Sequence, residues 1–244
     1  MNSTIKSMAA SLVLAAGLAT FATTALAALP ADFDAKIAAR PEADKVRDAA
    51  RKPKESVQEL GLQEGMTVVD VAAGGGWFTR VLSAAVGPKG KVIAQFGQGG
   101  LRNNNGQAQR DMAKELGNVE PFFEATSAIL ANSADAAVTA MNLHDAYNRS
   151  EEAGLTFVKD IYNVLKPGGV AAIIDHAGSE GADNRALHRM TPASAKALIE
   201  KAGFQIVKES KVLANPKDDH TKGSHDQSLG RATDQFFFVV RKPK

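Results

Sequence analysis

The stretch VVDVAAGGGWFTR, residues 68–80, passes from an apolar run through three glycines into a segment of helical character. The run Thr67–Val71 contains three valines, a composition typical of a buried parallel strand. Glycines between a strand and a helix permit positive φ and let a ligand contact the backbone. In open α/β sheets the ligand lies at the carboxyl ends of the strands. The stretch therefore predicts a strand, a ligand-binding turn and a helix; a purely structural glycine turn is the alternative.

Strand and helix patterns alternate through the rest of the chain. Short apolar runs predict strands at 67–71, 91–96, 119–123, 136–141, 170–175, 204–213 and 235–241. Apolar residues at helical spacing predict helices at 78–86, 107–116, 151–165 and 191–202. The alternation predicts an α/β fold with a doubly wound, mostly parallel sheet. The last two strands have no helix between them and must pair antiparallel, because a parallel return needs a crossover of about a dozen residues.

The first 27 residues have the pattern of a secretory signal peptide. Lys6 is the only charged residue before an apolar run over about residues 8–22, and small residues flank a cleavage site at Ala27. The run is shorter than the roughly 20 apolar residues that a membrane span needs. We expect cleavage near Ala27, a mature chain in the periplasm or outside the cell, and no stable membrane insertion. An uncleaved N-terminal anchor is the alternative.

The mature chain is long enough for one α/β domain, expected at residues 61–244. Residues 41–60 are polar with spaced apolar positions and predict a helix pair interrupted near Pro53. Residues 28–60 are therefore expected to form an N-terminal helical segment. Its Arg40, Arg47 and Arg51 indicate an exposed helix face, although such a segment can also fold over a pocket as a lid.

The composition excludes several classes of site. Lys and Arg number 29 against 27 Asp and Glu, and no basic block predicts a nucleic-acid partner. The absence of cysteine excludes disulfides, zinc–thiolate sites, a thiol nucleophile and a lipoprotein anchor. The segments 218–220 and 225–226 carry Asp and His but match no strong metal-ligand spacing. We therefore expect a solvated loop there, no metal site, and a small-molecule substrate; the sequence does not predict the oligomeric state.

The glycine turn resembles the cofactor turn of class I S-adenosylmethionine methyltransferases. The spacing D-x-A-x-G-x-G, formed by Asp70, Ala72, Gly74 and Gly76, is similar to their acidic-x-G-x-G-x-G pattern. Ala72 stands in the first glycine place, where a methyl group is tolerable if φ is negative. The resemblance implies a Rossmann-like methyltransferase fold and S-adenosylmethionine (SAM) as the cofactor. It places cofactor contacts at these four residues and at Trp77, Gln95 and Asn142.

Further segments resemble a narrower bacterial family of predicted, often exported methyltransferases. The Lys166-Pro167-Gly168-Gly169 segment before the fifth strand is similar to that of class I enzymes. The resemblance to the narrower family rests on residues 76–79 (GWFT), 142–145 (NLHD), 175–177 (DHA), 187–189 (LHR), 202–204 (AGF) and 230–236 (GRATDQF). Together the shared features cover about residues 57–241.

The end of the second strand departs from the class I pattern. There these enzymes usually carry an Asp or Glu that accepts hydrogen bonds from the ribose hydroxyls, whereas this chain offers only Gln95 or Gln98. A charge-assisted hydrogen bond contributes about 1.5–3 kcal/mol and a neutral one about 1 kcal/mol. The departure predicts SAM binding about tenfold weaker, and it argues against NAD, which needs the same acid. The adenine contact is expected from residues 124–127.

Two His–Asp pairs follow neighbouring strands. His144 and Asp145 end the fourth predicted strand, and Asp175 and His176 end the fifth. Because the carboxyl ends of parallel strands meet at one edge, we expect the pairs to converge on the acceptor side of the cofactor. His144 is the candidate general base, oriented by Asp145 or Asp175, and His176 is a further candidate catalytic residue. Alternatively, His144 packs against the sheet and Asp145 caps a helix.

Three functions fit these patterns: a SAM-dependent methyltransferase acting on a small molecule, an exported non-catalytic binding protein with the same fold, and a lyase or hydrolase using His144 and His176. Trp77 either lines the ligand or covers the first helix. His188 and Arg189 are expected as a polar pair flanking the helix at 191–202.

Overall fold

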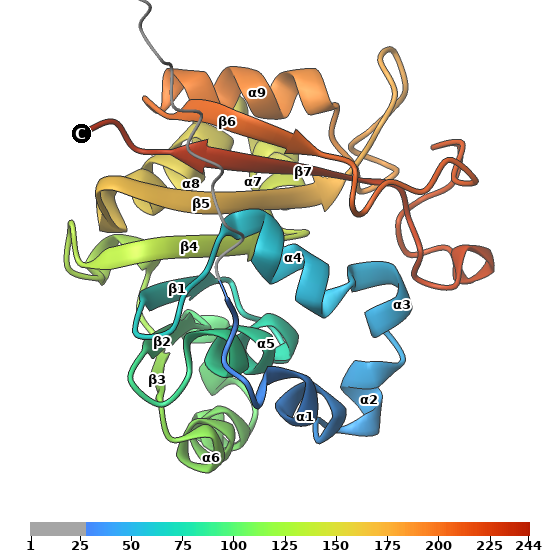
Figure 1. The fold of residues 1–244 in the computed structure, drawn as a ribbon. Coiled ribbons are helices and arrows are strands. Elements are labelled where there is room, and N and C mark those ends of the chain that lie inside the picture. The colour runs from blue at the N-terminus through green and yellow to red at the C-terminus, as the bar shows by residue number, and fades with distance from the viewer. Residues whose placement is uncertain (1–27) are drawn as a thin grey trace, which may run out of the picture.

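A seven-stranded sheet in the order β3-β2-β1-β4-β5-β7-β6 forms the centre of the molecule in the computed structural model, which describes residues 28–244 (Figure 1). The strands are β1 (Thr67–Val71), β2 (Lys91–Gln95), β3 (Val119–Phe122), β4 (Ala134–Ala140), β5 (Leu165–His176), β6 (Gln205–Ser210) and β7 (Gln235–Arg241). The first five pair parallel, and β7 lies antiparallel to both β5 and β6. The predicted fold class is confirmed.

Helices cover both faces of this sheet. They are α1 (Phe33–Ala38), α2 (Glu42–Lys45), α3 (Asp48–Arg51), α4 (Pro53–Leu60), α5 (Trp77–Val86), α6 (Gln107–Leu116), α7 (Leu143–Arg149), α8 (Glu151–Val164) and α9 (Pro192–Lys201), with short 3-10 helices η1 (Gln98–Leu101), η2 (Asn104–Gly106), η3 (Thr126–Ala128) and η4 (Gln227–Leu229). Apolar residues of α1, α4 and α5 share one core with Val68, and those of α7, α8 and α9 share the other with Val69. The side chains of successive strand residues thus pack into the cores on opposite faces of the sheet, as the two-residue period of a strand requires.

The sheet reverses its winding at β1, which pairs with β2 on one side and with β4 on the other. At such a switch point the connections leave in opposite directions and open a crevice at the carboxyl ends of the two strands. The turn after Asp70 lies at this crevice. Helices α2 and α3 and the long loop before β7 lie on the same side of the sheet (Figure 1).

The N-terminal segment packs onto the first core through Phe33, Val57 and Leu60, all buried. Within the region expected as a helix pair there are three short helices, α2 to α4. α4 begins at Pro53 directly after Lys52, whose φ is +43°. Proline suits the first helical position, because its missing N–H would have no partner there.

Helix α7 was not predicted from the sequence. β4 ends at Ala140, and α7 begins at Leu143 in the segment expected as a strand end. Leu143 and Ala146 are buried on the core side of α7, so His144 lies in the first turn of a helix next to β5. Among residues 28–244, no helix is both long and apolar enough to cross a membrane. The predicted signal peptide lies outside the described residues.

Candidate functional site

A cavity of about 180 Å³ lies at the switch point, at the carboxyl ends of β1 and β4. The turn at residues 71–75 lines it, together with Asp70, Trp77 and Asn142 from the predicted site and Arg47 and Arg51 from the N-terminal segment. The Nδ2 of Asn142 donates to the carbonyl oxygen of Ala140 at 2.8 Å. The structure therefore brings much of the predicted cofactor site to one hollow.

Asp70 is a buried carboxylate at the end of β1, with 3% of its surface exposed. Its Oδ2 accepts a 2.6 Å hydrogen bond from the hydroxyl of Thr79 in α5. Burial raises the pKa of Asp70 to about 7, against the opposing effects of the Thr79 hydrogen bond and the charge of Arg51. Burial in turn lowers the pKa of Arg51 to about 10. At neutral pH the cavity thus contains a cation beside a half-ionised acid.

The backbone of the glycine turn is open to the cavity at two positions. A Cβ built on Gly74 meets nothing closer than the carbonyl oxygen of Ala72 at 3.9 Å, and one on Gly75 meets no atom within 4 Å. Gly76, with φ of +79°, is closed, because a Cβ there would lie 2.5 Å from Sδ of Met112. The condition of negative φ at Ala72 is not met: its φ is +55°, a conformation that costs a non-glycine residue roughly 1–2 kcal/mol.

Gln95 holds this strained turn in place. Its Oε1 accepts from the backbone N–H of Ala72 at 2.9 Å, and its Nε2 donates to the carbonyl oxygen of Glu124 at 2.9 Å. Both functions of the amide are used, and Gln95 is not among the residues that line the cavity. Only a side chain with both an acceptor and a donor satisfies Ala72 and Glu124. This explains why β2 ends in a glutamine, where the class I pattern has an acid.

Replacing Gln95 with Glu is therefore expected to destabilise the protein rather than to improve the cofactor site. The carboxylate can accept from Ala72 but cannot donate to Glu124, and it adds a buried charge. We expect the free energy of unfolding to fall by about 1–3 kcal/mol, measured by urea denaturation. The control Gln205→Glu changes an exposed amide on the edge strand β6 and should stay within about 0.5 kcal/mol. Equal stability of the Gln95→Glu protein and the wild type would contradict this role.

Trp77 is the first residue of α5, and its indole attaches the N-terminal segment to this helix. Its Nε1 donates to the carbonyl oxygen of Asp44 and to Oδ1 of Asp48, both at 3.1 Å. The guanidinium groups of Arg40 and Arg51 lie 5.4 and 5.2 Å from its ring centroid, within cation–π range. The indole lines the cavity without filling it, so the hollow over the glycine turn stays open.

His144 and Asp175 form a buried pair beside the cavity. Nδ1 of His144 lies 2.7 Å from Oδ1 of Asp175, and the backbone N–H of His144 donates to Oδ2 at 2.8 Å. The exposed fractions of the two residues are 2% and 0%. Because the carboxylate accepts at Nδ1, the Nε2 of His144 is the free ring nitrogen. Burial lowers the pKa of His144, but the hydrogen bond and charge of Asp175, aided by Asp145, outweigh it and raise the pKa above the usual value.

His176 and Asp145 lie on either side of this pair. The rings of His176 and His144 are 5.4 Å apart between centroids, and Nδ1 of His176 lies 2.6 Å from the hydroxyl of Thr233. Burial lowers the pKa of His176 to about 4, so the ring is neutral at neutral pH. Oδ1 of Asp145 lies 3.2 Å from Nε2 of His144. The expected convergence of the two His–Asp pairs is observed, and Asp175 is the residue that orients His144.

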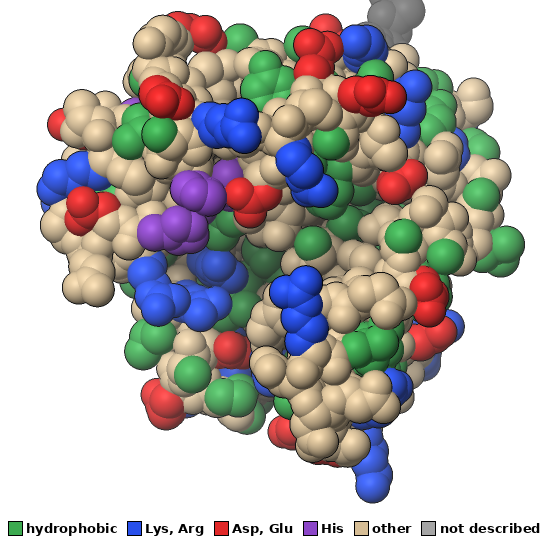
Figure 2. Space-filling model, turned by 180° about the vertical axis from the view of Figure 1, so that it is seen from behind, with side chains coloured by type: hydrophobic (Ala, Val, Ile, Leu, Met, Phe, Trp, Pro, Cys, Tyr) green, Lys and Arg blue, Asp and Glu red, His purple; other side chains and the backbone are tan. Residues whose placement is uncertain are grey.

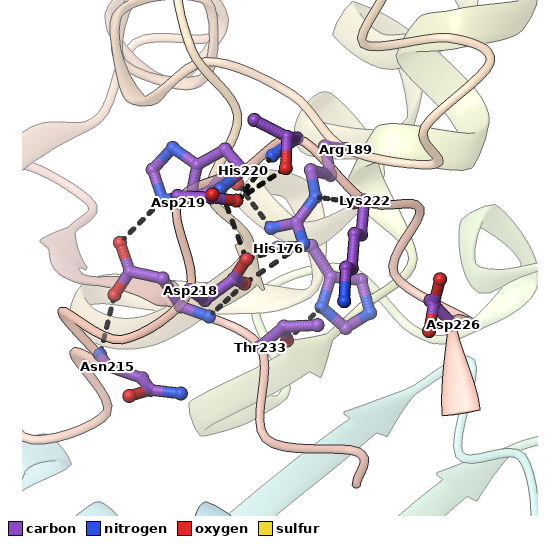
Figure 3. A network of polar contacts seen from close by, with 12 residues as sticks. His176, Arg189, Asn215, Asp218, Asp219, His220, Lys222, Asp226 and Thr233 are labelled. Carbon is purple, nitrogen blue, oxygen red and sulfur yellow. Dashed lines mark hydrogen bonds and ion pairs between the residues drawn. The ribbon is translucent and has the colours of Figure 1, made fainter. Parts of the chain in front are cut away.

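A buried ion pair supports the loops around these residues (Figure 3). Arg189 is fully buried, and its Nη2 lies 2.9 Å from Oδ2 of Asp218. Its Nη1 and Nε donate to the carbonyl oxygens of Ala177 and Lys222 at 2.8 and 2.9 Å, and Asp218 also accepts from the backbone N–H of Asp234 at 2.7 Å. Arg189 precedes α9, as expected of a residue flanking that helix, but it is buried in this network. The expectation of a solvated loop is wrong at Asp218, which is buried.

Sequence reasoning missed three contributors to the site. Arg47 and Arg51 were expected on an exposed face, yet both line the cavity. Their spacing of four residues puts them on one side of the chain, but the sequence alone does not show that this side faces the cavity, where Arg51 lies over the ring of Trp77. His188 lies 3.3 Å from Asp145 between Nδ1 and Oδ1, although 43 residues separate them in sequence.

The fold and this site together define a class I methyltransferase, and comparison with known proteins agrees. A solved SAM-dependent methyltransferase from Aquifex aeolicus has 22% identity and a TM-score of 0.61, covering 86% of this chain and 98% of its own. A putative methyltransferase from Bacillus halodurans has 17% identity and a TM-score of 0.57, with 80% and 100% covered. A possible exported protein from Bordetella parapertussis has 15% identity and a TM-score of 0.55, with 81% and 68% covered. These likenesses concern the fold.

The chain belongs to the ubiE/COQ5 methyltransferase family, whose model matches residues 49–183. It is accordingly a SAM-dependent methyltransferase, and SAM is its cofactor. No curated protein sequence matches the chain significantly.

The residues around the cavity fit this cofactor chemically. The Nε of Arg47 is buried without a hydrogen-bond partner among the described residues, and with Arg51 it supplies the donors that a methionine carboxylate requires. Asp70 supplies a carboxylate for a cationic group, and the open backbone at Gly74 and Gly75 admits close approach. The volume of about 180 Å³ is below the roughly 300–1,000 Å³ common for ligand pockets, and Arg47 and Arg51 of the N-terminal segment form part of its wall.

Proposed function

We propose that this methyltransferase transfers the methyl group of SAM to a small-molecule acceptor outside the cytoplasm. The observation that carries the proposal is the adjacency of two features: the cavity over the glycine turn, and the buried His144–Asp175 pair. Asn142 lines the cavity two residues before His144. A cofactor in the cavity and a proton acceptor beside it are what methyl transfer to a protonated acceptor needs.

The cofactor supplies an activated methyl group, and this chain's residues hold and orient it. Arg47 and Arg51 bind its carboxylate, and Asp70 stabilises its positive charge. The turn at Gly74 and Gly75 accommodates the body of the molecule against the backbone. Because Gln95 is occupied in holding the turn, the ribose lacks the strong hydrogen-bond acceptor that an acid at the end of β2 would provide. We therefore expect a lower affinity for SAM than in enzymes that carry an acid at this position.

His144 acts as the general base in this proposal. Asp175 accepts a hydrogen bond from Nδ1–H, so the lone pair of the neutral ring is on Nε2, which lies 3.2 Å from Oδ1 of Asp145. Nε2 would take the acceptor's proton as the acceptor attacks the methyl group. His176 stays neutral and Asp145 is half exposed, so both are positioned to contact the acceptor rather than to remove its proton.

Residues 28–60 act as a lid over the cofactor. Their attachments near the cavity are polar: Trp77 to Asp44 and Asp48, and Arg80 to the Asp44 carboxylate at 3.3 Å. Lys52, in the left-handed region with φ of +43°, separates α3 from the apolar anchor α4. A shift of α2 and α3 alone would break these polar contacts and the cation–π contacts of Arg40 and Arg51 with Trp77. Helices α1 and α4 on either side would keep Phe33, Val57 and Leu60 in the core.

SAM affinity is expected to rise as the pH increases from about 6 to 8. Asp70 has a folded pKa of about 7, raised from 3.8, so it is protonated below pH 7 and ionised above it. A cationic ligand favours the ionised carboxylate, which releases a proton on binding; we expect an affinity gain of about tenfold. S-adenosylhomocysteine lacks the sulfonium charge and should show a smaller change. Calorimetry at both pH values checks this, and Asp70→Asn should abolish the SAM trend; a trend that persists in this variant contradicts the assignment.

Export through the predicted signal peptide is part of the proposal. Its support is the charge, length and small-residue pattern of residues 1–27, and one fold relative is described as a possible exported protein. The mass of the protein recovered from the periplasm tests the cleavage site: a chain that begins at Ala28 is expected. A mass that includes residues 1–27, or recovery from the cytoplasm only, would refute it.

Product formation separates catalysis from mere binding. The purified protein is incubated with SAM, a chelator and the low-molecular-weight fraction of a bacterial extract, and S-adenosylhomocysteine is measured by mass spectrometry. We expect S-adenosylhomocysteine in proportion to protein concentration, together with a new extract component heavier by one methylene. If SAM binds and no product forms with any extract, the non-catalytic binding protein becomes the better account.

A further inference from the structure

Three potential metal ligands meet at the open side of the His144–Asp175 pair. Nε2 of His144 lies 3.2 Å from Oδ1 of Asp145, and Nδ1 of His188 lies 3.3 Å from the same oxygen. One ligand atom from each of the three residues lies within 4.8 Å of the other two. Histidine side chains gather on the face shown in Figure 2, beside an acidic side chain and at the edge of a hollow.

The spacing of these atoms suits a small metal ion. A tetrahedral ion with bonds of about 2.0–2.1 Å to nitrogen and oxygen holds neighbouring ligand atoms about 3.3 Å apart. The two contacts to Asp145, at 3.2 and 3.3 Å, match that separation. An ion could therefore enter among the three residues with little movement of their side chains.

The free nitrogen of His144 is the observation that points to a ligand. His144 is 2% exposed, and its Nε2 is buried without a hydrogen-bond partner among residues 28–244. Because Nδ1 donates to Asp175, a neutral His144 carries its lone pair on Nε2, which lies 3.2 Å from the anionic Oδ1 of Asp145 without a hydrogen bond between them. Two electron-rich atoms this close repel each other, and a cation bound there, either a proton or a metal ion, would relieve the repulsion.

The surroundings are those of a metal-binding histidine. Metal ligands of this type commonly donate their second ring N–H to a carboxylate, which fixes the ring and raises its basicity. Asp175 occupies that position for His144, and the Arg189 network holds the chain next to His188. The side chains of Asp145 and His188 are 58% and 51% exposed, which leaves a coordination position open to solvent.

We propose that His144, Asp145 and His188 bind one divalent transition-metal ion, with Zn²⁺ as the best-suited probe. Two imidazoles and one carboxylate form a common ligand set for zinc and related ions, and three protein ligands with an open fourth position allow a further small molecule to coordinate. The ion and the acceptor's proton would compete for the same Nε2 atom. The metal site does not rest on the methyltransferase proposal, because it needs neither SAM nor an acceptor.

The test titrates the purified protein, free of any histidine tag and of SAM, with Zn²⁺ by calorimetry and with Co²⁺ by visible spectroscopy. We expect one ion per chain with micromolar or tighter affinity and Co²⁺ bands of a four- or five-coordinate site. His188→Ala and Asp145→Asn change exposed side chains and should each weaken binding at least tenfold. His220→Gln removes a histidine outside the cluster and should leave binding unchanged.

Two results would overturn the proposal. One is the absence of stoichiometric Zn²⁺ binding, which would leave a proton on His144 as the cation between the two residues. The other is His188→Ala protein that binds as tightly as the wild type and has the same Co²⁺ spectrum, because this variant keeps the buried His144–Asp175 pair and should fold.

Discussion

His144→Asn protein is expected to make S-adenosylhomocysteine about 10²–10⁴ times more slowly than the wild type while binding SAM with nearly unchanged affinity, because the variant loses only a general base. Asparagine is the sharpest replacement. Its Nδ2 can take the place of the ring Nδ1 and donate to Asp175, so the buried carboxylate keeps a partner. What disappears is Nε2, the proposed proton acceptor.

The measurement combines turnover by mass spectrometry, in the presence of a chelator, with SAM binding by calorimetry. His220→Asn serves as the control, since His220 pairs with Asp234 and Ser179 outside the site. If His144→Asn retains wild-type turnover, the base assignment is wrong. If the variant loses SAM binding as well, His144 also supports the cofactor cavity. The proposal that the cavity binds the cofactor independently of the His144–Asp175 pair would then be wrong.

Arg189→Met protein should lose about 3–5 kcal/mol of unfolding free energy, because removing one partner of a buried ion pair leaves the other charge uncompensated. The side chains of Arg189 and Asp218 are both fully buried. The substitution also removes the donors to the carbonyl oxygens of Ala177 and Lys222. The loops that carry His188 and flank His176 lose their common support.

Urea denaturation followed by circular dichroism measures the effect. Arg185→Met removes an exposed arginine from the same loop and should change stability by less than about 0.5 kcal/mol. The double variant Arg189→Met/Asp218→Asn should recover part of the loss, since no charge then remains buried and asparagine can still accept from the backbone N–H of Asp234. A single Arg189→Met change of less than about 1 kcal/mol would show that the network contributes little.

The alternation of strand and helix patterns predicted the mostly parallel sheet and the antiparallel pairing of its last two strands. The valine-rich β1 and the glycine turn after it predicted a strand followed by a ligand-binding turn; the switch point at β1 was not predicted. The place of β7 between β5 and β6 was not predicted, yet Phe236–Val240 is continuously apolar and buried, as a central strand requires, whereas β6 is mostly exposed, as suits an edge strand. Helix α7 was missed because Asn142–Asp145 follows a strand directly and offers too few residues for a periodic pattern.

The site was predictable where it depends on strand ends and unpredictable where it depends on tertiary contact. Asp70, Asn142 and the convergence of His144 with Asp175 follow from the rule that parallel strands end at one edge. The turn with positive φ at Ala72 is held by a hydrogen bond to Gln95, which lies 23 residues away in the sequence. From the sequence alone, Gln95 was expected to contact the ribose instead. The roles of Arg47 and Arg51 depend on the N-terminal segment folding back over Trp77.

The most direct test of the central claim, that the turn after Asp70 receives SAM, is calorimetry of SAM binding to the wild type and to Gly75→Val at pH 8. A Cβ added at Gly75 would meet no protein atom within 4 Å, and Gly75 lines the cavity, so we expect the variant to fold and its valine to block the site. The account predicts micromolar binding of one SAM per chain to the wild type, none to Gly75→Val, and normal binding to the control Gly223→Val, whose new Cβ would also meet no atom closer than 3.7 Å. No heat from the wild type at millimolar SAM, or equal binding by Gly75→Val, would contradict it.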